Sequence, residues 1–130
     1  MKRLLPLLAA ALWLSACGSS GSATYTKAAT AACLSKQGVG TKPVPQSVDF
    51  VAWSAEGGSF RATLSDNFVT VSFGPTVDKA NGIADAYRRF AASNVGVTDV
   101  LRQQGNAVML WHLHPSDTDL SVVTGCLKDK

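Results

Sequence analysis

Two histidines near the end of the chain, His112 and His114, are its only imidazole side chains. They lie two residues apart in a predicted strand, where alternate side chains point to the same face, so together they could bind one Zn²⁺ ion. A zinc site takes three or four protein ligands, and the nearest further candidates are Asp117 and Asp119. Those carboxylates are better explained as first-turn acids of a helix, which favour its positive end. We therefore predict no metal site. His112 and His114 are the candidate ligands in the alternative that the protein binds a metal.

Other catalytic patterns are equally sparse. No Gly-x-Ser-x-Gly nucleophile elbow occurs. The sequence around Ser72, the most central serine, shows nothing that would activate its hydroxyl as a nucleophile. The Glu56-Gly57-Gly58 segment is too short for a phosphate loop and lacks a following lysine. We expect no catalytic residues and no cofactor. The alternative is a small hydrolase or metal-binding protein that uses His112 and His114.

The start of the chain has the pattern of an export signal. Lys2 and Arg3 precede the apolar run Leu4–Leu14, which is shorter than the roughly twenty residues that span a bilayer and is typical of a signal peptide. The segment Leu14-Ser15-Ala16-Cys17 follows and resembles the lipobox of bacterial lipoproteins. This resemblance implies cleavage before Cys17 and a diacylglycerol on its thiol. The protein would then be held by lipid on the extracytoplasmic face of the cell membrane.

These observations divide the chain into three parts. Residues 1–16 are predicted to be the lipoprotein signal peptide, and residues 17–26 the lipidated cysteine with a Gly/Ser-rich flexible tether. Residues 27–130 are predicted to form a single α+β domain.

The remaining cysteines, Cys33 and Cys126, are predicted to form a disulfide. The chain has three cysteines, and Cys17 lies in the signal junction, which leaves one pair. Thiols outside the cytoplasm are usually oxidised. Two buried free thiols are the alternative.

The charge of the chain gives no reason to expect nucleic acid as a partner. Its formal net charge of +3 comes from twelve basic and nine acidic residues, and two of the basic ones, Lys2 and Arg3, belong to the signal. The rest is near neutral, and its Arg88-Arg89 pair is typical of a solvated helix face. Binding to nucleic acid without sequence preference needs a clustered positive patch.

Hydrophobic periodicity and turn residues predict four helices and four strands. The predicted helices are 26–36, 47–55, 77–93 and 117–127, with Ser47 and Ser116 as N-caps of the second and fourth. The predicted strands are 60–64, 68–73, 97–103 and 107–113. The stretch 47–55 also fits a strand; we favour the helix because its apolar residues fall on one face.

This order predicts an α+β fold with a four-stranded antiparallel sheet of two hairpins and helices packed on one face. Two ββα-like units follow an N-terminal helix, and they resemble a degenerate repeat in which Asn67, Val69 and Val71 correspond to Asn106, Val108 and Leu110.

One sheet face is predicted to carry a possible binding surface. If the helices cover the face of Val108 and Leu110, Met109 and Trp111 lie on the open face, where Trp53 could join them. The alternative is that the connector 39–55, which contains Trp53, folds over that face.

The domain also resembles small exported domains found in actinobacteria. The resemblance rests on Ala32-Cys33-Leu34, on Gly105-Asn106-Ala107-Val108 before Trp111, and on Gly125-Cys126-Leu127. It implies a shared fold and disulfide and carries no activity with it. We therefore expect a membrane-anchored, non-catalytic interaction or accessory module of the cell envelope, with the membrane as one partner through lipid on Cys17 and an envelope protein as a possible second.

Overall fold

The computed structural model describes residues 24–90 and 96–128. The predicted signal peptide, the lipobox with Cys17 and most of the predicted tether lie outside the described residues. Among the helices that are described, none combines the length and the apolar character needed to span a bilayer.

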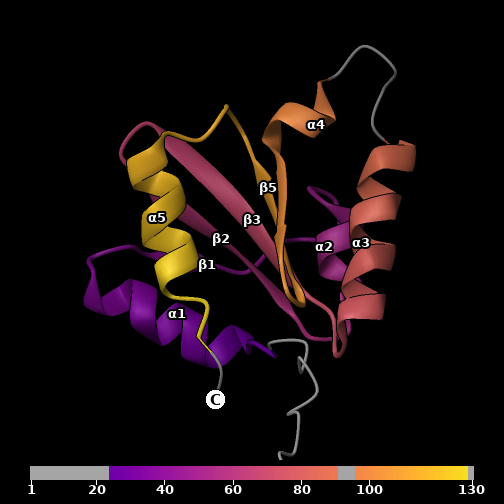
Figure 1. Ribbon diagram of the computed structural model, residues 1–130, viewed down its shortest axis with the longest axis horizontal. Helices are drawn as coiled ribbons and strands as arrows, with labels where there is room; N and C mark the ends of the chain where they lie inside the picture. Colours follow the sequence, from indigo (N-terminus) through magenta and orange to yellow (C-terminus); the bar gives the residue numbers. More distant parts are fainter. Residues whose placement is uncertain (1–23, 91–95, 129–130) are drawn as a thin grey trace, which may run out of the picture.

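The described residues form an α+β fold around one antiparallel sheet of five strands in the order β1-β2-β3-β5-β4 (Figure 1). The strands are β1 (Thr41–Lys42), β2 (Ser59–Leu64), β3 (Asn67–Phe73), β4 (Leu101–Gln104) and β5 (Ala107–Trp111). Both predicted hairpins are confirmed, and β3 pairs with β5 at the centre of the sheet. The prediction of four strands is wrong by one, because the two residues of β1 between Gly40 and Pro43 add a short edge strand to β2. Short strands next to proline are common at sheet edges.

The structure has five described helices: α1 (Lys27–Lys36), α2 (Phe50–Trp53), α3 (Val77–Phe90), α4 (Val97–Val100) and α5 (Asp117–Gly125). Of the two predicted caps, Ser116 is confirmed and Ser47 is wrong. Ser116 accepts a hydrogen bond from the backbone nitrogen of Asp119 at the start of α5. Helix α2 is confirmed as a helix but begins later than predicted, because Asp49 rather than Ser47 accepts the capping hydrogen bond, from the nitrogen of Ala52.

The predicted strand 97–103 is wrong in its first half. Residues Val97–Val100 form the single turn α4, and the strand begins at Leu101. Arg102 stabilises this turn, since its guanidinium donates to the backbone oxygens of Thr98, Asp99 and Leu101. An arginine that hydrogen-bonds the last carbonyls of a helix favours its termination there.

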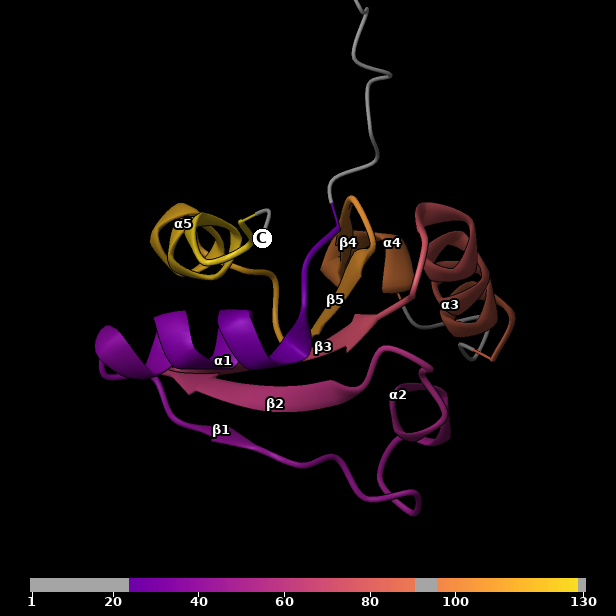
Figure 2. The same cartoon turned by 90° about the horizontal axis from the view of Figure 1, so that it is seen from below.

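Helices cover both faces of the sheet, so the prediction of helices on one face is wrong. Helices α1 and α5 lie on one side, and α2 and α3 on the other (Figures 1 and 2). The first layer buries one face of β3 and β5, including Val71 and Met109, and the second buries Val108 against Ala84 of α3. Strand β5 reads as a continuous apolar run, which is the pattern of a strand buried on both faces.

The two ββα units are therefore not related as the suggested repeat requires. Val69 and Val71 face the α1–α5 layer, whereas Val108 and Leu110 face the α3 layer. Corresponding positions thus point to opposite faces of the sheet.

The disulfide between Cys33 and Cys126 is confirmed, with a Cα–Cα distance of 5.5 Å. It joins α1 to the residue that caps the C-terminus of α5. The first and last helices of the domain are thereby covalently linked.

Contacts with the rest of the domain are made before residue 27, the predicted start of the domain. Tyr25 is buried, and its backbone pairs with the side chain of Asn106: the amide oxygen accepts from the Tyr25 nitrogen at 2.6 Å, and the amide nitrogen donates to the Tyr25 oxygen at 2.9 Å. The same amide nitrogen donates to the backbone oxygen of Gly74 at 2.8 Å. Asn106 thus joins the start of the domain to the β4–β5 turn and to the end of β3.

Candidate functional site

The predicted binding surface of Met109, Trp111 and Trp53 does not form. Met109 and Trp111 are 1% and 2% exposed and belong to the core under α1 and α5. Trp53 lies on α2 and is 52% exposed. The prediction failed because it assumed that this face of the sheet is open.

Trp53 is instead part of an exposed apolar cluster on the opposite side of the molecule. We call it the apolar rim, and it consists of Val48, Phe50, Trp53 and Phe90, whose exposed fractions run from 52% to 71%. The rings of Phe50 and Trp53 lie 6.0 Å apart. Single exposed apolar side chains are common on protein surfaces, whereas a large exposed apolar patch is typical of a binding surface.

The apolar rim borders a cavity of about 620 Å³ over the sheet, here called the sheet cavity. Its walls come from the segment that leads into α2, the end of α3, helix α4 and strands β2, β3 and β5. The lining is mostly apolar and comprises Val48, Asp49, Phe50, Val51, Arg61, Phe68, Thr70, Tyr87, Phe90, Val97, Val100, Leu110, Trp111 and His112. Ligand sites in proteins are typically of this size and have few polar groups among apolar ones.

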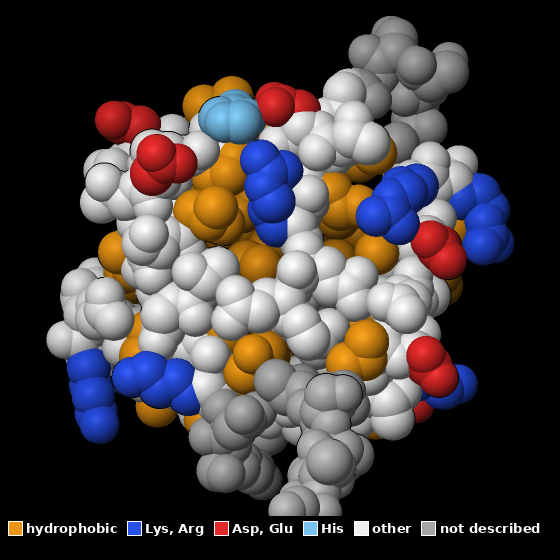
Figure 3. Space-filling model, in the orientation of Figure 1, with side chains coloured by type: hydrophobic (Ala, Val, Ile, Leu, Met, Phe, Trp, Pro, Cys, Tyr) orange, Lys and Arg blue, Asp and Glu red, His pale blue; other side chains and the backbone are white. Residues whose placement is uncertain are grey.

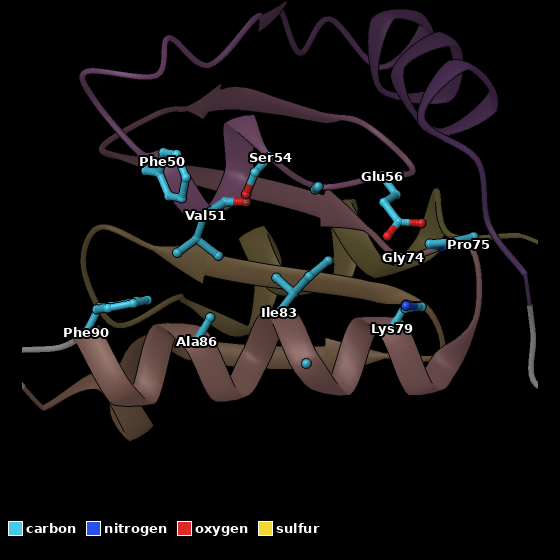
Figure 4. Close-up of a pocket in the computed structure, with 12 residues that line it drawn as sticks. Phe50, Val51, Ser54, Glu56, Gly74, Pro75, Lys79, Ile83, Ala86 and Phe90 are labelled. Carbon is cyan, nitrogen blue, oxygen red and sulfur yellow. Dashed lines mark hydrogen bonds between the residues drawn. The ribbon is translucent and has the colours of Figure 1, made fainter.

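A smaller cleft of about 230 Å³ separates α2 from α3 and adjoins the sheet cavity (Figure 4). Phe50 and Val51 of α2 project toward Ile83 and Phe90 of α3. The two hollows share Phe50, Val51 and Phe90 in their linings, so they are continuous along this side of the molecule.

The first polar group of the sheet cavity is a tyrosine bound to an aspartate. The Tyr87 hydroxyl donates to Oδ2 of Asp49 at 2.8 Å, and Oδ1 of the same carboxylate caps α2. Burial raises the pKa of the Tyr87 phenol well above its usual range; the charge of Asp49 and this hydrogen bond raise it further. The nearby Ser72 hydroxyl acts in the opposite direction, although it is not aligned for a hydrogen bond. The phenol is therefore a neutral donor and not a base.

The second polar group is Arg61, whose Nε is buried without a hydrogen-bond partner among the described residues. Its guanidinium carbon lies 4.4 Å from the centre of the Phe68 ring, in a cation–π contact. The His112 ring stacks on the same phenylalanine at 4.4 Å between centroids. Strand β3 lies between β2 and β5, so Arg61 and His112 flank Phe68.

The two histidines of the sequence hypothesis have separate surroundings. His112 packs on Phe68, whereas Nδ1 of the exposed His114 lies 2.7 Å from the carboxylate of Asp99 on α4. Strand β5 ends at Trp111, so the alternation on which the predicted pair depended does not extend to His114. Within the described ranges, no group of three or more His, Cys, Asp or Glu side chains could hold a metal ion.

Sequence reasoning missed Arg61, Phe50 and Phe90. The alternation of β2 assigned Arg61 to the polar, solvent-facing side of a half-buried strand. Nothing in the sequence of β2 shows that residues of α2 and α3 line the same cavity as Arg61. A signal was present in Val48 and Phe50, which place apolar side chains around the short helix α2.

Charged side chains do not form a patch of one sign on the face seen in Figure 3, where acidic and basic groups are scattered among exposed hydrophobic ones. No protein-family model, curated protein or solved structure matches this chain. The interpretation of the site therefore depends on its geometry and chemistry.

Proposed function

We propose that this protein is a lipid-anchored, non-catalytic module of the cell envelope that binds an apolar partner at the apolar rim and the sheet cavity. The observation that carries the proposal is the sheet cavity itself, about 620 Å³ of mostly apolar lining under three exposed side chains of the apolar rim, Val48, Phe50 and Phe90. The lipobox around Cys17 supports the membrane location. The polar groups of the cavity support binding and not catalysis, because Tyr87 is neutral and hydrogen-bonded to Asp49.

The proposal is tested with N-phenyl-1-naphthylamine, a neutral dye whose fluorescence rises in apolar surroundings. The protein is the mature chain from residue 17 with Cys17→Ser, which cannot accept lipid. We expect saturable binding that weakens at least fivefold in Phe50→Ser and in Phe90→Ser, since both side chains line the cavity. Both are exposed, so their replacement leaves the core intact.

Leu113→Ser is the matched control, because Leu113 is also an exposed apolar side chain, at 54%, and does not line either hollow. Its dye affinity should equal that of the parent chain. Absence of saturable binding, or equal loss in all three variants, would overturn the proposal.

The alternative of a small hydrolase or metal-binding protein that uses His112 and His114 has less support. The carboxylate of Asp99 contacts Nδ1 of His114, and the His112 ring is stacked on Phe68. A single His–Asp contact between exposed side chains is a common surface interaction.

A further inference from the structure

We infer that the sheet cavity takes an amphipathic organic anion, with its apolar body in the cavity and its acidic group on Arg61. The inference rests on the proposed function, since it names the class of ligand for the same cavity. The expected ligand is a small molecule with a carboxylate, and not a neutral apolar molecule or a cation.

The side chain of Arg61 has a buried hydrogen-bond donor without a partner among the described residues. A guanidinium is always charged and carries five N–H donors. No hydrogen bond or ion pair of the described residues engages the Arg61 side chain, and its Nε is shielded from solvent. The contact with Phe68 holds the group in place but uses none of its donors. A buried donor without a partner is unfavourable, and a carboxylate would satisfy it.

Asp49, the other charged group among the described residues of the cavity lining, already has hydrogen-bond partners. Asp49 accepts from the Ala52 nitrogen with one carboxylate oxygen and from the Tyr87 hydroxyl with the other. A cationic ligand would have to compete with both donors. Within the described lining, Arg61 is therefore the charged group whose hydrogen-bonding capacity is unmet, which favours an anion.

The guanidinium of Arg61 is held in position by an aromatic ring. Arg61 extends from the central part of β2, opposite Thr70 of β3, and lies over the Phe68 ring. An arginine that is held by an aromatic ring loses little freedom when it binds a planar carboxylate. The apolar side chains Val51, Val100 and Leu110 on the other walls leave room for an alkyl or aromatic body.

The test measures displacement of bound N-phenyl-1-naphthylamine by decanoate and by decan-1-ol, which share a chain length and differ in the acidic group. In the mature Cys17→Ser chain, we expect decanoate to displace the dye at a concentration at least tenfold lower than decan-1-ol. Arg61→Met keeps the apolar stem and removes the charge, so it should abolish this preference without weakening the dye or the alcohol. Arg61→Lys should retain part of the preference.

Arg88→Met is the matched control, because it removes one positive charge from an exposed arginine outside the cavity lining. It should leave the preference unchanged. Equal potency of decanoate and decan-1-ol in the parent chain, or an unchanged preference in Arg61→Met, would overturn the inference while dye binding still supports the proposed function. Absence of dye binding would overturn both. The affinity of Arg61→Met for the neutral dye reports whether its cavity is intact.

Discussion

At the scale of single residues, Tyr87 and Asp49 couple the fold to the cavity. Asp49 ends an irregular segment and starts α2, and the Tyr87 hydroxyl holds that carboxylate from α3. One side-chain contact thereby fixes the distance between the two helices that flank the sheet cavity. Its strength depends on the phenol remaining protonated.

The raised pKa of Tyr87 predicts a loss of stability at alkaline pH. An unfolded phenol ionises near pH 10. The folded one keeps its proton there, because burial and Asp49 raise its pKa. Above about pH 10 the unfolded chain therefore binds fewer protons, and this group reduces the free energy of unfolding by about 1.4 kcal/mol per pH unit. Below pH 10 the contribution is constant.

The measurement is urea unfolding of the parent chain and of Tyr87→Phe between pH 7 and about pH 11. At neutral pH, Tyr87→Phe should unfold more easily by about 1.5–3 kcal/mol, since it loses a hydrogen bond to a charged group. The difference between the two chains should shrink above about pH 10. A difference that stays constant across the range would contradict the prediction.

Arg61 shows how far residue-level reasoning reaches. The alternation of Phe60, Arg61 and Ala62 correctly places the arginine on the face opposite to the two apolar residues. Whether that face meets water or a cavity is decided by α2 and α3, which are distant in sequence. The chemistry of the residue is visible in the sequence, and its surroundings are not.

At the scale of elements, the helices and hairpins with clear periodicity and capping residues were predictable. Helix α1 lies within the predicted range 26–36, and α5 follows its predicted cap Ser116. Two of the short elements were not predicted: α4 is a single turn, and β1 has two residues. Such elements depend on a partner, Arg102 for α4 and the edge of β2 for β1, and not on their own sequence pattern.

The assignment of helices to sheet faces is the error with the largest consequence for the site. Treating the strands as half-buried left Met109 and Trp111 on an open face. Both faces of β3 and β5 are in fact covered where α1, α5 and α3 pack. The apolar hollow among the described residues lies between α2 and the end of α3, over Phe68 and Leu110.

The disulfide between α1 and the end of α5 is expected to supply a large part of the stability of the domain. Cys33 and Cys126 are 93 residues apart, and the chain-entropy model assigns a loop of that length about 4.5 kcal/mol as an upper value. The double variant Cys33→Ala/Cys126→Ala should lower the free energy of unfolding by a few kcal/mol, measured by urea unfolding.

The parent chain in reducing buffer is the control, and it should lose a similar amount, because both treatments leave the packing of α1 and α5 otherwise unchanged. An effect below about 1 kcal/mol in both would show that the unfolded chain gains little freedom when the link is removed.

At the scale of the whole molecule, the sheet cavity and the start of the domain lie at opposite ends of the sheet. Tyr25 is bound to Asn106, immediately before β5, and the cavity is lined by His112, immediately after it (Figure 1). Seven residues lie between Cys17 and Tyr25, and the eight chain steps reach at most about 29 Å. With lipid on Cys17, the domain would be tethered at the end near Asn106, and the cavity would lie at the other end of the sheet.

The whole arrangement depends on lipid at Cys17, which a single substitution tests. Cys17→Ala removes the thiol that would accept diacylglycerol, so the protein should leave the membrane fraction or remain unprocessed with its signal peptide attached. Ser20→Ala, in the predicted tether, is the control and should behave as the parent chain does. The measurements are fractionation of the cells and the intact mass of the protein extracted from each fraction. The parent chain should begin at Cys17 and carry the added mass of its acyl chains. A Cys17→Ala chain that stays in the membrane fraction at the mass of a processed protein would show that the domain is held there by a protein contact. The exposed apolar rim would then be the first surface to test for that contact.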